Sequence, residues 1–160
     1  DPTKHYQTLI PCNLYGRHDQ YGNNNSHLIP AVIRKIHEAK LAGNETVSIW
    51  GDGTARREFM NAADLADFIY FAIDRLDQLP QNLNVGLGHD YSITDYYRAI
   101  ASVVGFSGSF EYDLSKPVGM KQKLVDVNNL HSLGWRHEIS LIDGITEAYK
   151  FYKESFKIEI

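Results

Sequence analysis

One histidine stands at a junction between two kinds of sequence. His27, in the segment NSHLIP, lies where a loop rich in Gly and Asn meets an apolar segment. Histidine is the usual acid–base catalyst at neutral pH because its charge changes close to that pH. A histidine at the start of a helix is more often a capping or surface residue, and this chain has seven histidines. His27 is therefore a candidate for proton transfer, with an ordinary helix-start residue as the alternative.

A second group of candidate residues follows the apolar segment VSIW. In WGDGTARREF, Arg56 and Arg57 come after a tight turn that begins just beyond Trp50. A guanidinium binds a phosphate or diphosphate through two parallel N–H bonds, and the flat face of Trp50 can stack on a nucleotide base. The alternative is a solvated basic pair beside a core tryptophan. Spacing alone leaves both interpretations open.

Three lysines gather in the segment SKPVGMKQKL, which Pro and Gly interrupt. Lys116, Lys121 and Lys123 lie within eight residues. Such a loop can close over an anionic ligand, although a run of charges is usually a solvated face. The segment PCNLYG is the remaining candidate, because a strand followed by an Asn and a Gly-rich loop is a common ligand-binding place in α/β sheets.

Composition limits the class of protein. The chain has 160 residues, 43% of them hydrophobic, and a formal charge of −4 from 16 Lys and Arg against 20 Asp and Glu. A mildly acidic chain argues against general binding to nucleic acid or to an anionic membrane. The single cysteine, Cys12, excludes an intramolecular disulfide and suits a reducing cytosol, so we expect a cytoplasmic protein. No Cys/His cluster has metal-ligand spacing, so no metal site is expected.

Hydrophobic periodicity predicts short strands mixed with amphipathic helices, without strict strand–helix alternation. Strands are expected over 6–12, 47–50, 83–88 and 109–113, with a short extended piece at 123–127 and a loop over 16–25. Helices are expected from residue 26 or 27 to 40, from Asn61 with the apolar stripe Leu65, Ile69 and Ile73, from Ser92, over 128–133, and from Ser140 to about 155. The pairs Asn61/Asp64 and Ser140/Asp143 each resemble a capping box, and Ser92 and Asp95 are expected to open the helix between them. The pattern is that of an α/β or mixed α+β protein.

Four blocks of the sequence occur in an order that resembles one family. These blocks are NLYGRHD…NSHLIPAVIRKIHEAK, VSIWGDGTARREFMNAADLAD, LNVGLGHDYSITDYYRAIASVVGF and SKPVGMKQKLVDVNNLHSLGW. Together they resemble the C-terminal half of the GDP-L-fucose synthases, which are GDP-4-keto-6-deoxy-D-mannose 3,5-epimerase/4-reductases of the extended short-chain dehydrogenase/reductase superfamily. The resemblance covers nearly the whole chain.

The resemblance implies a division of the chain and a set of functional residues. Residues 1–45 would hold the last strand and a helix of an NADP-binding Rossmann domain, and residues 46–160 the smaller domain that binds the nucleotide sugar. Catalysis would use His27 as one epimerisation acid–base, with its partner cysteine and the Ser/Tyr/Lys set in a missing N-terminal half; Cys12 is not that partner. The residues implied to line the nicotinamide end are Pro11, Cys12, Asn13, Leu14 and His27. Those implied to contact the GDP-sugar are Lys35, Trp50, Arg57 and Lys123.

The chain also departs from the family pattern. Arg17 stands where the family has Pro, Val118 where it has Asp, Gln122 where it has Arg, and Lys35 where it often has Arg. The changes at Val118 and Gln122 keep a related enzyme acting on another nucleotide sugar, such as a GDP-heptose, as an alternative. A non-catalytic nucleotide-sugar binding module is a further alternative. We expect the chain to be a fragment of a longer homodimeric enzyme and to be inactive by itself.

Overall fold

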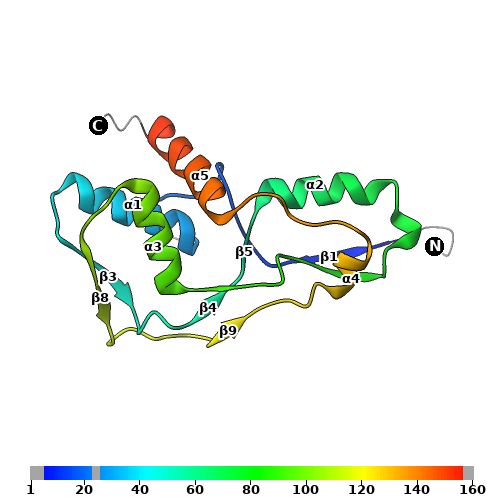
Figure 1. Cartoon of the computed structure of the whole chain (residues 1–160), viewed down its shortest axis with the longest axis horizontal. Coiled ribbons are helices and arrows are strands. Elements are labelled where there is room, and N and C mark those ends of the chain that lie inside the picture. Colours follow the sequence, from blue (N-terminus) through cyan, green and yellow to red (C-terminus); the bar gives the residue numbers. More distant parts are fainter. Residues whose placement is uncertain (1–5, 23–25, 157–160) are drawn as a thin grey trace.

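The computed structural model describes residues 6–22 and 26–156, and within them short strands alternate with helices (Figure 1). The strands are β1 (Thr8–Pro11), β2 (Asn13–Tyr15), β3 (Thr46–Trp50), β4 (Arg56–Arg57), β5 (Phe59–Asn61), β6 (Asn82–Val85), β7 (Tyr91–Ser92), β8 (Ser109–Asp113) and β9 (Gln122–Lys123). The helices are α1 (Leu28–Leu41), α2 (Ala62–Ile73), the short 3-10 helix η1 (Leu76–Gln78), α3 (Ile93–Val104), α4 (Asn128–Ser132) and α5 (Leu141–Ser155). The predicted loop 16–25 follows β2, and its residues 23–25 lie outside the described residues.

Parallel pairing dominates the strands. β1 pairs with β6, β2 with β5 and β3 with β8, each pair in parallel. In the three-stranded sheet, β4 lies between β7, to which it is antiparallel, and β9, to which it is parallel. Parallel strands joined through helices are the α/β arrangement predicted from the sequence, so the fold class is confirmed. The β1–β6 and β2–β5 ladders join residues on the two sides of residue 45. The predicted division of the chain at that residue stays a prediction.

Two hydrophobic cores hold the elements together. The first packs α1, α3 and α5 against one another through side chains such as Ile33, Ile100 and Ile145. The second packs α2 and α4 against β1 and β6 around Phe68 and Leu130. The two cores occupy opposite ends of the molecule, and β4, β5 and β9 lie between them (Figure 1). Arg57 on β4 and Lys123 on β9 therefore lie on the strands between the two cores.

Helix starts follow local capping chemistry. Ser92 and Asp95 open α3 as predicted, and they form a capping box: the Ser92 side chain accepts from the backbone N–H of Asp95 and the Asp95 carboxylate accepts from that of Ser92. At α5 the Ser140 hydroxyl accepts from the backbone N–H of Asp143, which is half of the predicted box. These caps place the first turns of α3 and α5 without help from distant residues.

The predicted capping box at α2 is wrong. Asn61 does cap the helix, but its side chain accepts from the backbone N–H of Ala63 at 2.9 Å. The Asp64 carboxylate, only 3% exposed, instead accepts from the backbone N–H groups of Glu138 and Ile139. A tertiary contact therefore uses the carboxylate that the local pattern assigned to the helix start.

The predicted apolar stripe of α2 is also wrong in part. Ile69 and Ile73 are 44% and 58% exposed, while Phe68 and Ala72 are buried. Apolar residues lie on most sides of this helix, so periodicity alone does not select the buried side. The edge-to-face contact of Phe68 with Trp135, with ring centroids 5.2 Å apart, fixes the rotation of the helix.

Candidate functional site

His27 is the residue at which α1 begins. Its backbone is extended, with φ −65° and ψ 169°, and its side chain makes no capping hydrogen bond. The imidazole is 71% exposed, and its Nδ1 lies 3.8 Å from Oδ1 of Asp19, whose side chain is only 15% exposed. This distance is too long for a hydrogen bond, but the carboxylate is close enough to attract a protonated ring. His27 is therefore available to a ligand rather than used to cap the helix.

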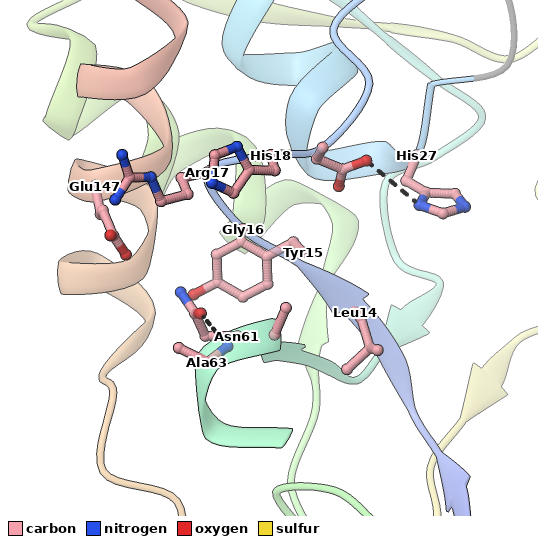
Figure 2. Close-up of a pocket in the computed structure, with 11 residues that line it drawn as sticks. Leu14, Tyr15, Gly16, Arg17, His18, His27, Asn61, Ala63 and Glu147 are labelled. Atoms are coloured by element: carbon pink, nitrogen blue, oxygen red, sulfur yellow. Dashed lines mark hydrogen bonds and ion pairs between the residues drawn. The ribbon is translucent and has the colours of Figure 1, made fainter. Parts of the chain in front are cut away.

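A cavity of about 470 Å³, the His27 pocket, opens beside this side chain (Figure 2). β2 contributes Leu14, the start of α2 contributes Ala62 and Ala63, and α5 contributes Glu147. Figure 2 shows His27 on one side of the pocket and Arg17 with Glu147 on the other. The pocket also includes the positions Tyr15, Gly16, Arg17, His18, Asp19 and Asn61.

A second cavity of about 630 Å³, the Trp50 pocket, lies on the other side of the α1 start. Ser26 and Leu28 line the Trp50 pocket, whereas His27 between them lines the His27 pocket. The remaining lining residues are Ala31, Val32, Arg34, Lys35, Glu38, Trp50, Ile93, Tyr97, Pro117 and Val118. The first turn of α1 thus separates the two cavities.

Trp50 offers an open aromatic face to its pocket. It ends β3 and is 65% exposed. The ammonium of Lys116 lies 5.7 Å from the centroid of its ring, within the range of a cation–π contact. Val118 lines the same cavity. One of the predicted lysines therefore does lie beside the predicted stacking residue.

Lys35 reaches from α1 to the edge of β3. Its ammonium donates to the backbone oxygen of Ser48, which ties the helix to the strand. Burial lowers the pKa of Lys35, and the carboxylate of Asp113 acts in the opposite direction. The side chain lines the Trp50 pocket, so the structure brings Lys35 and Trp50, both expected to contact the GDP-sugar, to one cavity.

Arg57 and Lys123 are register partners on β4 and β9. Nη1 of Arg57 donates to the backbone oxygen of Met120 at 2.6 Å. Nζ of Lys123 donates to Oδ1 of Asn13 at 3.4 Å, and Nδ2 of Asn13 donates to the backbone oxygen of Glu58 at 2.8 Å. The two cations thus stand together, next to the strand that leads to the His27 pocket.

One short segment, residues 117–120, joins the Trp50 pocket to Arg57 and Lys123, the cation pair. Pro117 and Val118 line that pocket, while Met120 accepts from the Arg57 guanidinium. A Cβ built on Gly119 would lie 3.6 Å from Nη2 of Arg57, so the guanidinium lies against this backbone. This segment therefore links the wall of the Trp50 pocket to the Arg57 guanidinium.

Comparison with known proteins identifies the chain's family. Residues 3–86, more than half of the chain, match the sequence model of the NAD dependent epimerase/dehydratase family. The chain belongs to this family.

Individual relatives agree with the expected resemblance. The chain is 54% identical over 147 residues to GDP-L-colitose synthase from Yersinia pseudotuberculosis, a match over 92% of this chain and 48% of the relative. It is 52% identical over 151 residues to GDP-L-fucose synthase from Azorhizobium caulinodans, over 94% of this chain and 48% of the relative. The similarity to GDP-L-fucose synthases is confirmed. The chain spans about half the length of the curated relatives it matches.

Solved structures give the same fold. A GDP-mannoheptose C4 reductase from Campylobacter jejuni with NADP bound superposes with a TM-score of 0.81 at 32% identity, over 92% of this chain and 52% of that one. A GDP-6-OMe-4-keto-L-xylo-heptose reductase from the same organism gives a TM-score of 0.85 at 33% identity, over 93% and 54%.

In this member of the epimerase/dehydratase family, the residues expected at the nicotinamide end differ in exposure. Pro11 is exposed and Leu14 is half-buried in the wall of the His27 pocket, so both leave apolar surface for a flat ring. Cys12 is only 6% exposed, and its side chain packs in the second core. Burial, reinforced by the Glu58 carboxylate, raises the pKa of the Cys12 thiol to about 12. This thiol is therefore neutral at physiological pH.

Arg56 and Arg57 do not act as one fork. Nε of Arg56 donates to Oδ1 of Asp90 at 2.6 Å, whereas Arg57 is directed to Met120 and Lys123. Successive residues of a strand point to opposite faces, so only one of the two arginines faces the region of Lys123. Of the two arginines, Arg57 alone was assigned to the GDP-sugar by the family resemblance, and its role there stays a prediction.

Sequence reasoning did not single out Arg34, Glu38 or Asp90. Arg34 and Glu38 precede and follow Lys35 on α1, and helical spacing could have placed all of them near one cavity. Asp90 carries no such signal, because its partners come from β4 and β9.

Two features are absent from residues 6–22 and 26–156, the part of the chain that the structure describes. No helix there is long and apolar enough to cross a membrane. No group of three or more His, Cys, Asp or Glu side chains in the same ranges is placed to hold a metal ion.

Proposed function

We propose that this chain provides the nucleotide-sugar side of an NADPH-dependent epimerase/reductase. The reaction converts GDP-4-keto-6-deoxy-D-mannose to GDP-L-fucose by epimerisation at C3 and C5 and reduction at C4. One observation carries the proposal: the start of α1 separates a pocket that contains His27 from a pocket that contains Trp50 and Lys35. A nucleotide sugar can then place its sugar beside the histidine and its base beside the tryptophan.

The diphosphate is proposed to bind the cation pair. Arg57 and Lys123 are register partners, and a segment that contacts Arg57 also lines the Trp50 pocket. A guanidinium can bind phosphate oxygens through two parallel bonds, while an ammonium acts as a compact charge. Together they neutralise charge between the base and the sugar, which is where the diphosphate lies in a nucleotide sugar.

The base is proposed to be guanine, read by Arg34 and Glu38. Arg34 and Glu38 line the Trp50 pocket one turn apart, with Nη1 of Arg34 4.0 Å from Oε1 of Glu38. Nε of Arg34 has no hydrogen-bond partner among the described residues. Guanine accepts at O6 and N7 and donates from N1 and N2, so a guanidinium and a carboxylate together match its edges. Adenine and uracil do not present this pattern.

His27 is proposed to move a proton at the carbon next to the ketone. Such protons are acidic because the carbanion delocalises into an enolate. A base removes the proton, and an acid on the other face of the ring returns it with the opposite stereochemistry. The exposed imidazole can take either role. We propose that the partner cysteine and the Ser/Tyr/Lys set lie in the part of the relatives that this chain does not span.

The hydride for reduction at C4 is supplied by NADPH when it is bound. Pro11 and Leu14 fit its nicotinamide end, since both expose apolar surface and Leu14 shares the pocket with His27. Asn13 is tied to Glu58 and Lys123, so it can hold the cofactor-side strand beside the cation pair. Cys12 contributes as a core residue, because its buried side chain offers no surface to a ligand.

The test is an assay of the intact protein, which we propose contains this chain together with the part of the relatives that the chain does not span, with GDP-4-keto-6-deoxy-D-mannose and NADPH. We expect NADPH to be consumed and GDP-L-fucose to be the product. Consumption of NADPH without GDP-L-fucose would contradict the proposed substrate. The isolated 160-residue chain is expected to bind GDP without turnover, so NADPH-dependent turnover by that chain would contradict the proposed division of catalytic groups. We further propose a cytoplasmic homodimer, which sedimentation and cell fractionation would test.

A second candidate is the same chemistry on another GDP-sugar. The relatives include a GDP-L-colitose synthase and GDP-heptose reductases, and Val118 replaces the family's Asp in the wall of the Trp50 pocket. Parallel assays with the 4-keto precursors of GDP-colitose and of GDP-heptoses separate these reactions, because the true substrate gives the highest kcat/KM. Binding of all GDP-sugars without turnover by the intact protein would instead favour a binding module.

A further inference from the structure

The sheet that carries the cation pair is very small. β7, β4 and β9 have two residues each, so few ladder hydrogen bonds hold them in register. Asp90 immediately precedes β7, and its side chain is only 5% exposed. A buried carboxylate is costly unless it is paired and hydrogen-bonded, so its partners show what it holds in place.

The Asp90 carboxylate bridges two strands. Its Oδ1 accepts from Nε of Arg56 on β4 at 2.6 Å, and its Oδ2 accepts from Nε2 of Gln122 on β9 at 2.6 Å. Nη2 of Arg56 also donates to the backbone oxygen of Asp90 at 2.6 Å. Burial raises the pKa of Asp90, but the bonds from Gln122 and Arg56 outweigh burial and the pKa is lowered. The carboxylate is therefore charged at neutral pH.

Strand geometry places Asp90 and the cation pair on opposite faces. Arg56 and Gln122 are register partners, and both point to the face on which Asp90 lies. Arg57 and Lys123 are the next partners along the same two strands, so their side chains leave from the other face. Asp90 can thus set the distance between β4 and β9 without touching a ligand of Arg57 and Lys123.

We propose that Asp90 is the positioning residue of the diphosphate site: it fixes β4 beside β9 so that Arg57 and Lys123 converge on one diphosphate. This inference rests on the proposed function, because it takes the diphosphate of a nucleotide sugar as the ligand. Gln122, a departure from the family pattern, donates to Asp90 through its amide. The departure therefore keeps a hydrogen-bond donor at this position.

The test replaces Asp90 in the intact protein, since the isolated chain is expected to have no turnover, and measures binding and turnover separately. In Asp90→Asn the new amide cannot accept from both Arg56 and Gln122, so we expect the Kd for GDP and the KM for the GDP-sugar to rise about tenfold or more. The kcat at saturating substrate is expected to stay close to that of the wild type, because no reacting group is changed. A purely structural defect would instead lower the active fraction and leave KM unchanged.

A second substitution tests the bridge itself. Gln122→Glu alone sets two carboxylates against each other and should weaken GDP binding. Combined with D90N, the carboxylate introduced by Q122E can accept from the new amide, while the amide oxygen still accepts from Arg56. We therefore expect the double variant to bind GDP more tightly than either single variant. An additive loss of affinity in the double variant would overturn the inference.

The matched control is Asp95→Asn. Asp95 is also a hydrogen-bonded carboxylate, but it caps α3 and does not bond to β9. Even if D95N destabilises the protein as much as D90N does, it should leave the KM for the GDP-sugar unchanged. If D90N does not fold, Gln122→Ala removes one arm of the bridge at an exposed residue and should still raise the Kd for GDP. Unchanged GDP binding in D90N and Q122A would overturn the role of Asp90 but not the proposed function. Failure of the wild type to bind GDP would overturn both.

Discussion

Arg57 and Lys123 are paired residues of a parallel ladder that joins segments 66 positions apart in the chain: Arg57 lies on β4 and Lys123 on β9. Nζ of Lys123 also reaches Asn13 on the strand that leads to the His27 pocket. This pairing brings together two charges that the sequence placed in separate loops. Through Met120 and Asn13 it connects the proposed diphosphate site to a segment that lines the Trp50 pocket and to the strand that lines the His27 pocket.

Loss of either cation is expected to weaken GDP binding. Arg57→Ala and Lys123→Ala should each raise the Kd for GDP about ten- to hundredfold, since each removes a charge-assisted contact. The affinity of both variants should also depend less on salt concentration than that of the wild type. Isothermal titration calorimetry at several salt concentrations measures both effects. Lys121→Ala, an exposed lysine that is not a register partner of Arg57, serves as the control and should bind GDP normally.

Glu38 is expected to select the base. Glu38→Gln loses the carboxylate that would accept from N1 and N2 of guanine, so the preference for GDP over ADP and UDP should fall about tenfold or more. The affinity for ADP and UDP should change little, because the stacking face of Trp50 remains. Competition binding with the three nucleoside diphosphates gives the ratios. Equal ratios in the variant and the wild type would contradict the role of Glu38.

His27 is expected to be required for proton exchange. In deuterated solvent, His27→Asn should incorporate deuterium into the keto-sugar at least about a hundredfold more slowly than the wild type, because a general acid–base contributes that much. Binding of GDP should be unchanged. Mass spectrometry of the recovered sugar measures the exchange, and His131→Asn, on α4, is the control. Exchange at the wild-type rate in His27→Asn would show that the histidine is only a helix-start residue.

Stability is expected to fall in acid because of His37. This side chain is 2% exposed, and its Nδ1 lies 2.9 Å from the hydroxyl of Tyr149. Burial, with smaller effects from Lys40 and Lys153, lowers the pKa of His37 below its ordinary 6.5. The unfolded chain therefore binds this proton first, and the free energy of unfolding should decline as the pH falls from 6.5 toward the lower native pKa.

Urea unfolding at a series of pH values tests this expectation. His37→Gln should show a shallower decline between neutral and acid pH, because one of the titrating groups is removed. Some decline should remain, since burial also lowers the pKa of His131 and His137. An unchanged slope in the variant would contradict the role of His37.

Any side chain at Gly53 is expected to lower the stability of the fold. Its φ is +71°, and an added Cβ would lie 2.2 Å from Oγ1 of Thr94 and 2.7 Å from Cε1 of Tyr112. Gly53→Ala should therefore destabilise the fold by about 2 kcal/mol or more. Gly43→Ala is the matched control, because φ there is +67° but nothing lies within 4 Å of the added atom. Chemical denaturation of both variants separates the steric cost from the backbone cost.

Local chemistry allowed much of the fold to be predicted from the sequence. Helix starts such as that of α3 follow from side chains within one turn, and strands such as β3 and β8 follow from segments that contain β-branched or aromatic residues. His27, Lys35 and Trp50 could be named from their motifs and from the resemblance to GDP-L-fucose synthases. Their roles in binding and catalysis stay predictions.

Only the tertiary structure decided the features that depend on residues far apart in the chain. The rotation of α2 was set by the contact of Phe68 with Trp135, which periodicity does not contain. The separation of Arg56 from Arg57 followed from the two faces of a strand, and the pairing of Arg57 with Lys123 from the register of β4 and β9. Asp90 gained its two partners in the same way. Contacts of this kind join residues far apart in the chain, so only the folded chain fixes them.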